Sequence, residues 1–244
     1  MRVSSLDSLR RYLQIQLAIP VHGREPPQPS ITISREAGAG AITIATMLAD
    51  RLNESKKHSD KSPSWTVFDR NLASQVLIDH KLPLNLEKFI VEDARLPVDS
   101  IVEELLGLHP TPWTFVQQTT KTILRLVSWG RVIVVGRGAE VVTKRLPYVF
   151  HIRLVASFDQ RVQHAAAHYQ LTTPEAARKV REEDQARRRY LRRYFDADID
   201  NPLLYDLVIN TGSLGFAETA ELIERAAVRH YEGFLKTRQP VHAA

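Results

Sequence analysis

The stretch Ile31-Thr-Ile-Ser-Arg-Glu-Ala-Gly-Ala-Gly-Ala-Ile-Thr-Ile-Ala45 decides the fold of this chain. A β-branched run ends in a loop of small residues and passes directly into a helical pattern of apolar side chains at Ile44, Met47, Leu48 and Leu52. A strand, a loop of phosphate size and a helix N-terminus, in this order, are typical of an anion-binding loop at the edge of a sheet.

The loop keeps only part of a Walker A sequence. With Gly40 as its last glycine, a Walker A loop requires glycine at position 35, lysine at 41 and serine or threonine directly after it. The chain has Arg35, Ala41 and Ile42 at these places, and Thr43 follows one step late. The backbone half of a phosphate cradle is therefore present, and the lysine is missing.

Glycines in this loop let backbone N–H groups approach a phosphate, and the dipole of the following helix points toward it. The Thr43 hydroxyl is a candidate ligand for Mg²⁺. An ordinary strand-to-helix turn would use the same small residues for close packing, so the loop alone leaves both interpretations open. The candidate phosphate-binding positions are Gly38, Ala39, Gly40, Ala41, Ile42 and Thr43.

Length and composition indicate a globular protein. The chain has 244 residues, 43% of them hydrophobic, which suffices for one substantial core with a subdomain. No apolar run approaches the roughly 20 residues of a membrane span, and the N-terminus lacks the continuous apolar segment of a signal peptide. Because the chain has no cysteine, disulfides and thiolate metal sites are excluded, and we expect a cytoplasmic protein with no membrane partner.

The net charge of +5 is concentrated in residues 178–193, where eight basic side chains stand against three acidic ones. The rest of the chain is neutral, which favours a single anion-binding segment. Helical spacing places Asp184, Arg187, Arg188 and Arg192 on one face. Three interpretations are a lid that closes on phosphates, a solvated face and a nucleic-acid patch; nucleic acid is the least favoured because glycine and aromatic interleaving are lacking.

Strand and helix patterns alternate around the loop. We expect strands at 30–34, 65–69, 131–136, 148–155 and 206–210, and helices at about 41–53, 158–169 and 217–234. A further helix begins with Thr173 as N-cap and Pro174 at its first position, and it runs through the basic segment. Five short strands with helical crossovers predict an α/β fold with a doubly wound parallel sheet, in which ligands bind at the carboxyl edges of the strands.

Residues 4–19 have the pattern of an amphipathic helix, followed by a proline-rich tether. Packing on the core and homodimer formation are its candidate roles. Residues 70–128 show broken helical patterns punctuated by proline, typical of a segment that covers a substrate. The expected division is an appendage at 1–29, a core domain at 30–234 with a helical insertion at 70–128 and a lid region at 158–195, and a tail at 235–244.

Charged residues follow three of the expected strands. Arg35 stands at the start of the loop. Asp69 is placed to accept hydrogen bonds from a ribose or a substrate amine, although acids at strand ends are also ordinary turn residues. Arg137 stands between two glycines at the end of an apolar strand, where a guanidinium can bind phosphate in a bidentate manner. An edge salt bridge is the alternative role of Arg137.

Five segments, taken in order, resemble the cytidylate kinase-like family of P-loop nucleoside monophosphate kinases. They are ITISREAGAG at 31–40, VFD at 67–69, VIVVGRG at 132–138, EDQARRRY at 183–190 and YDLVINT at 205–211. The resemblance covers roughly residues 30–230. It implies transfer of the γ-phosphate of ATP, with Mg²⁺, to CMP or dCMP, so that a nucleoside triphosphate and a nucleoside monophosphate are the expected partners.

The resemblance also implies roles for single residues. Gly38, Gly40 and Thr43 fall on the P-loop, Asp69 falls on the acid near the acceptor nucleotide, and Arg137 falls on the arginine that contacts the acceptor phosphate. The remaining matches belong to the mobile arginine lid. They are Asp184 and Arg187 on its Asp-x-x-Arg motif, Arg161 on the arginine that opens the lid helix pair, and the neighbouring Arg188 as a further phosphate-binding candidate.

The chain departs from the family in the loop and in base recognition. Ala41 stands where authentic cytidylate kinases carry the P-loop lysine, and Ile42 stands where relatives without that lysine carry an arginine. The arginine that reads cytosine has no clear counterpart, since Lys121 and Arg125 are both out of register. Cytosine specificity therefore has the least support among these inferences.

Two hypotheses of different class follow. In the first, the chain is an active kinase whose arginines replace the missing lysine, as positive groups aimed at phosphate charge can do. The catalytic candidates are then Arg35, Arg137, Asp184 and Arg187. In the second, motivated by Ala41 and Ile42, the chain is a nucleotide-binding pseudokinase that acts as a sensor or interaction module.

Overall fold

The structure is a computed structural model that describes residues 26–55, 63–69 and 112–238. The expected N-terminal helix at 4–19, most of the helical insertion (70–111) and the end of the tail (239–244) lie outside the described residues. The proposed division into appendage, core, insertion, lid and tail therefore stays a prediction.

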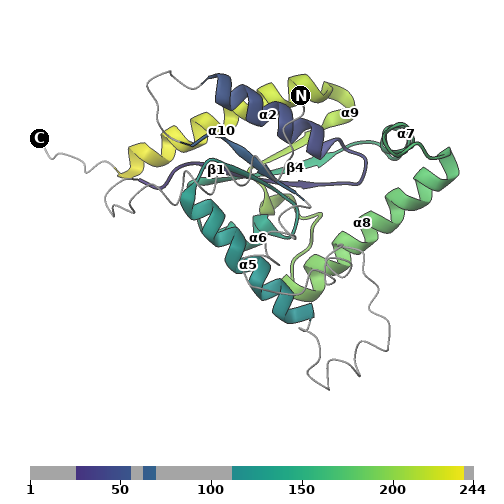
Figure 1. Ribbon diagram of the computed structural model, residues 1–244, viewed down its shortest axis with the longest axis horizontal. Coiled ribbons are helices and arrows are strands. Elements are labelled where there is room, and N and C mark those ends of the chain that lie inside the picture. Colours follow the sequence, from purple (N-terminus) through teal and green to yellow (C-terminus); the bar gives the residue numbers. More distant parts are fainter. Residues whose placement is uncertain (1–25, 56–62, 70–111, 239–244) are drawn as a thin grey trace, which may run out of the picture.

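One sheet of parallel strands forms the centre of the protein (Figure 1). It has five strands in the order β2-β3-β1-β4-β5. The strands are β1 (Ser30–Arg35), β2 (Thr66–Phe68), β3 (Val132–Val135), β4 (Val149–Val155) and β5 (Leu207–Asn210). This arrangement confirms the predicted doubly wound α/β fold. Because β1 lies between β3 and β4, the loop that follows β1 lies at the centre of the carboxyl edge.

Alternation along the strands builds two cores, one on each face of the sheet. Ile31 and Ile33 of β1 pack with α2 (Ala41–Glu54) and α10 (Phe216–Arg238). On the other face, alternate residues of β3 pack against α5 (Pro112–Trp129) and α6 (Ala139–Thr143). In the part of the chain that the structure describes, no helix is long and apolar enough to cross a membrane.

The second face of β1 and β4 is buried but polar. The Thr32 hydroxyl lies 2.8 Å from Nδ1 of His151, and the Arg153 guanidinium donates to the Ser34 hydroxyl at 3.0 Å. Burial lowers the pKa of His151 to about 4, so this imidazole is neutral at neutral pH. The sheet therefore holds hydrogen-bonding side chains close to the carboxyl edge on this face.

Two helices, α7 (Phe158–Tyr169) and α8 (Thr173–Phe195), make up the predicted lid region, called the lid below, and lie beside the carboxyl edge (Figure 1). The predicted N-cap of α8 is wrong by one residue. Thr172 precedes the helix, and its N–H and hydroxyl donate to the Glu175 carboxylate at 2.9 and 2.6 Å. An acid three residues after threonine makes a capping box at Thr172, and Pro174 is therefore the second helical residue.

The structure also differs from the prediction in the bounds of α10 and in three short elements that were not expected. Helix α10 begins one residue earlier and ends four residues later than 217–234. Two short helices, α6 and α9 (Thr211–Leu214), and a 3₁₀ turn at Pro202–Leu204 have no counterpart in the prediction. Segments of three to five residues are too short to show helical periodicity, so the sequence offered no signal for them.

Candidate functional site

The loop between β1 and α2 is held tightly at its two glycines. Gly38 has φ +82° and Gly40 has φ +80°, the left-handed region that side chains rarely adopt. The space where a Cβ of Gly38 would lie is taken by the main-chain carbonyl of Arg161, and the ring of Phe216 fills the same space at Gly40. Helix α2 begins directly after Gly40, so its N-terminal N–H groups belong to the loop.

Gly38→Ala is expected to lower the free energy of unfolding by about 3 kcal/mol, because a left-handed alanine is strained and its Cβ would collide with backbone that cannot rotate away. Urea denaturation followed by circular dichroism measures the change. Gly233→Ala is the matched control: it lies in α10 with open space around its Cα, and we expect a gain of about 0.5–1 kcal/mol. Equal effects of the two substitutions would contradict this account of the loop.

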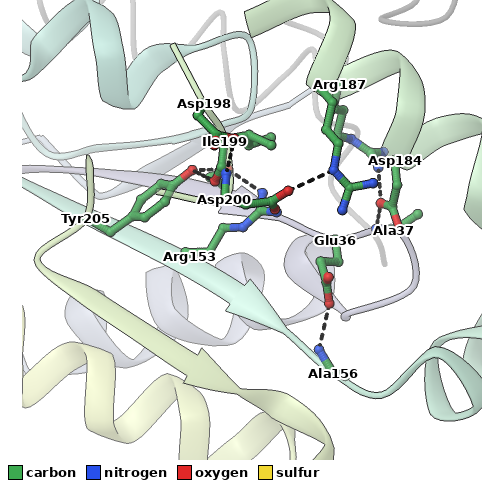
Figure 2. A network of polar contacts seen from close by, with 12 residues as sticks. Glu36, Ala37, Arg153, Ala156, Asp184, Arg187, Asp198, Ile199, Asp200 and Tyr205 are labelled. Atoms are coloured by element: carbon green, nitrogen blue, oxygen red, sulfur yellow. Dashed lines mark hydrogen bonds and ion pairs between the residues drawn. The ribbon is translucent and has the colours of Figure 1, made fainter. Parts of the chain in front are cut away.

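The lid contacts the loop directly through Arg161 of α7 and Asp184 of α8. The Ala37 N–H donates to Oδ1 of Asp184 at 2.7 Å, and Nη1 of Arg161 donates to Oδ2 of Asp184 at 2.6 Å and to the Ala37 carbonyl at 3.1 Å. Nε of Arg161 lies 3.3 Å from the Glu36 carboxylate. Figure 2 shows Asp184 and Ala37 facing each other across this contact. A guanidinium and a carboxylate of the lid thus meet at one residue of the loop, Ala37.

The charges of this cluster balance. Arg187 donates to Glu183 at 2.8 Å and to Asp184 at 3.4 Å, and Lys179 lies 3.0 Å from Glu183. Burial alone would raise the pKa of Glu183, but Arg187 and Lys179 outweigh it and hold the pKa below its usual value. The loop cluster, defined as Glu36, Arg161, Lys179, Glu183, Asp184 and Arg187, therefore pairs three cations with three carboxylates.

A second unusual backbone follows β3. Gly136, Arg137 and Gly138 have φ values of +81°, +64° and +68°, and a left-handed arginine costs about 1–2 kcal/mol. The Arg137 side chain is buried, and a Cβ on Gly138 would lie 2.8 Å from the Phe195 ring at the end of α8. A strained residue held between neighbouring elements is typical of functional sites.

Helix α2 begins with Ala41 and Ile42, which stand at the positions of the lysine and the next residue of a Walker A loop. Ala41 is buried, Ile42 is 45% exposed and Thr43 is half-buried. In P-loop kinases Mg²⁺ is held by one hydroxyl and one carboxylate of the protein together with the nucleotide phosphates. Among the described residues no cluster of three His, Asp or Glu could hold a metal. Thr43, which lies half-buried in the first turn of α2, has a hydroxyl that fits Mg²⁺ as one ligand beside a bound nucleotide.

Not all predicted site residues come together. Arg35 ends β1, and Arg137 follows the neighbouring β3, whereas Asp69 follows β2 at the edge of the sheet. The predicted common face of α8 is split, because Asp184 and Arg187 turn inward while Arg188 and Arg192 are exposed. Because successive residues of a helix point in different directions, the residue next to one that faces the loop can already face solvent.

Sequence reasoning missed Glu36 and Arg153. Glu36 accepts from the Ala156 N–H at 3.1 Å and pairs with Arg161. It lies in the loop close to the glycines, at a position that no sequence pattern distinguishes. Arg153 interrupts the apolar run of β4 and is 4% exposed. A charged residue in the middle of an apolar strand was the available signal, since arginine is buried only when it is paired.

Comparison with known proteins adds a family and a fold. A sequence model of the cytidylate kinase-like family matches residues 30–213. An uncharacterized protein from Eubacterium ventriosum aligns over 82% of this chain and 99% of its own, with TM-score 0.60 and 16% identity. A shikimate kinase from Acinetobacter baumannii aligns more loosely, over 87% and 96% of the two chains, with TM-score 0.44 and 15% identity.

A uronate isomerase from Corynebacterium glutamicum is 30% identical to this chain over 115 residues. The matched part is 47% of this chain and 22% of that protein, so the chain spans about a fifth of its length. The structural relatives bear on the fold alone.

Proposed function

Because the chain belongs to the cytidylate kinase-like family, we propose that it transfers the γ-phosphate of ATP to CMP, dCMP or a related small acceptor. The observation that carries the proposal is the meeting of Arg161 and Asp184 with the main chain of the loop at Ala37. A glycine-rich loop at a helix N-terminus, contacted by the guanidinium of Arg161 and with Arg187 close by on the second lid helix, has the parts needed to hold a polyphosphate.

Phosphoryl transfer requires little covalent help from a protein and depends on positioning and charge neutralisation. In this proposal the loop N–H groups and the dipole of α2 hold the donor phosphates, and Mg²⁺ with Thr43 supplies charge neutralisation when it is bound. Arg161 and Arg187 reach the phosphates by exchanging their carboxylate partners for phosphate oxygens. Arg137, on the neighbouring strand, holds the acceptor phosphate, and Asp69 lies toward the acceptor base or sugar.

A specific observation favours the second candidate, a nucleotide-binding pseudokinase. Ala41 is buried and apolar at the lysine position, and the Asp184 carboxylate already accepts the Ala37 N–H. The Asp184 carboxylate competes with a phosphate for this N–H donor. At the lysine position, Ala41 has no positive charge that would favour the phosphate. Such a protein would bind nucleotide without turnover.

The test uses the full chain with MgATP and a panel of nucleoside monophosphates, and it measures ADP formation. We expect acceptor-dependent ADP formation, greatest with CMP or dCMP. Thermal unfolding with ATP, CMP and CTP is measured in parallel. A raised unfolding temperature without turnover for any acceptor would replace the kinase by the pseudokinase, and no shift with any nucleotide would remove both.

A further inference from the structure

A second polar network lies beside the loop cluster, on the buried polar face of the sheet. Its centre is Arg153 of β4. Nη1 of Arg153 donates to the Ser34 hydroxyl of β1 at 3.0 Å, and Nη2 donates to Oδ1 of Asp200 at 3.1 Å. Because Arg153 is 4% exposed, its charge depends on the Asp200 carboxylate for compensation.

The same carboxylate reaches the lid. Nε of Arg188, on α8, donates to the other oxygen, Oδ2 of Asp200, at 2.8 Å. Asp200 therefore joins a buried guanidinium of the sheet to an exposed guanidinium of the lid helix. Figure 2 shows Asp200 between Arg153 and the helix that bears Arg187.

The segment that carries Asp200 is itself fixed. Its N–H donates to the Asp198 carboxylate at 3.1 Å, and the neighbouring Ile199 is buried. The Tyr205 hydroxyl donates to the Ile199 carbonyl at 2.8 Å, and the Tyr205 ring lies 5.9 Å from the Arg153 guanidinium. Burial, together with the nearby Glu140 charge, raises the pKa of Tyr205 to about 12, so the hydroxyl stays protonated and keeps this bond.

Helix α8 is thus attached near β1 at two points that lie one helical turn apart. The first is Asp184, which contacts the loop at Ala37, and the second is Arg188, which reaches Ser34 through Asp200 and Arg153. Packing of Ala176 and Val180 against α7 already holds the first half of α8, and these two polar contacts on successive turns add to the restraint on the rotation of its second half. The rotation decides which side chains of α8 face the loop.

We propose that Arg153 and Asp200 are positioning residues of the nucleotide site, which hold Arg188 and thereby help to fix the rotation of the second half of the lid helix over the phosphate loop. The proposal rests on the proposed function, in that it takes the loop to be a nucleotide site. It gives Arg188 the role of an anchor, in place of the phosphate ligand expected from the sequence. Neither Arg153 nor Asp200 touches the reacting atoms.

The first test measures hydrogen exchange in the nucleotide-free protein by mass spectrometry. Arg188→Gln is expected to speed exchange in the second half of α8 about two- to fivefold, the range for loss of an exposed ion pair. Asp200→Asn is expected to speed it further, because it also removes the partner of Arg153. The double variant should match Asp200→Asn alone, because both substitutions break one connection.

Asp196→Asn is the matched control, since Asp196 is an exposed aspartate four residues away with a left-handed backbone that asparagine tolerates. Its exchange in α8 should equal that of the unmodified protein. Unchanged exchange in Asp200→Asn, or purely additive effects in the double variant, would overturn the proposal.

The second test measures the affinity for ATP by calorimetry. Asp200→Asn and Arg188→Gln should each weaken ATP binding about two- to fivefold, and Arg188→Lys should recover part of the loss. Faster exchange with unchanged ATP affinity would mean that the network serves only the fold, which would overturn the positioning role. Absence of turnover in the unmodified protein would count against the kinase but not this proposal, whereas absence of ATP binding would overturn both.

Discussion

Replacing Arg161 by alanine is expected to lower the free energy of unfolding by about 3–5 kcal/mol, because it leaves the carboxylates of Glu36 and Asp184 largely buried without their shared cation. The side chains of Arg161, Asp184 and Glu36 are 9%, 10% and 18% exposed. The substitution also removes the hydrogen bonds to the carbonyls of Ala37 and Ala156. Denaturation in guanidinium chloride, followed by circular dichroism, measures the change.

Arg225→Ala is the control for this prediction. Arg225 is also paired with a carboxylate, Glu221, but its side chain is 76% exposed, and exposed pairs contribute about 0–1 kcal/mol. Adding Asp184→Asn to Arg161→Ala should recover part of the lost stability, because a buried charge is then removed. If Arg161→Ala proves as mild as Arg225→Ala, the lid is not held to the loop in the way the structure indicates.

Arg137→Gly is expected to lower turnover about 10³-fold, the lower end of the range for a guanidinium that neutralises phosphate charge. Glycine adopts the φ of +64° at this position without strain, so relief of strain and the greater freedom of the unfolded chain largely offset each other. Because the buried Arg137 side chain also loses its own contacts, stability should fall by about 1–3 kcal/mol. Steady-state assays and denaturation of the same preparation separate the two effects.

Two further variants sharpen this test. Arg137→Lys keeps the charge but loses the planar fork, and it should restore only part of the activity. Arg137→Ala keeps the left-handed strain without the guanidinium, so its turnover should match Arg137→Gly while its stability is lower. Turnover within a factor of two of the unmodified protein in Arg137→Gly would remove Arg137 from the acceptor site.

The sheet could be predicted from the sequence because each strand carries a strong local signal. Apolar runs such as Val132–Val135 leave little choice of conformation, and the helical spacing between them permits only right-handed crossovers. The N-cap of α8 was misplaced because Thr172 and Thr173 are both good caps, and only the contact with Glu175 separates them.

The contacts of the candidate site could be predicted only in part. The glycines, Arg137 and the basic segment are visible as motifs, but the partners of Arg161 lie 124 residues away in the loop and 23 residues away in α8. No spacing rule connects positions so far apart. Arg188 was assigned to phosphate because helical spacing places it on one face with Asp184 and Arg187, whereas its partner in the structure is Asp200, which belongs to no motif.

The balanced charges of the loop cluster have a kinetic consequence. A group of three cations and three anions has almost no field beyond its own dimensions, so it cannot draw a nucleotide toward itself from solution. In the proposed nucleotide site, the outward side of α8 is then a source of long-range attraction, because five further arginines beside Arg188 are exposed there. They are Arg178, Arg181, Arg189, Arg192 and Arg193. In that proposed site, capture of an anion by the exposed arginines should depend more strongly on ionic strength than its final binding among buried groups.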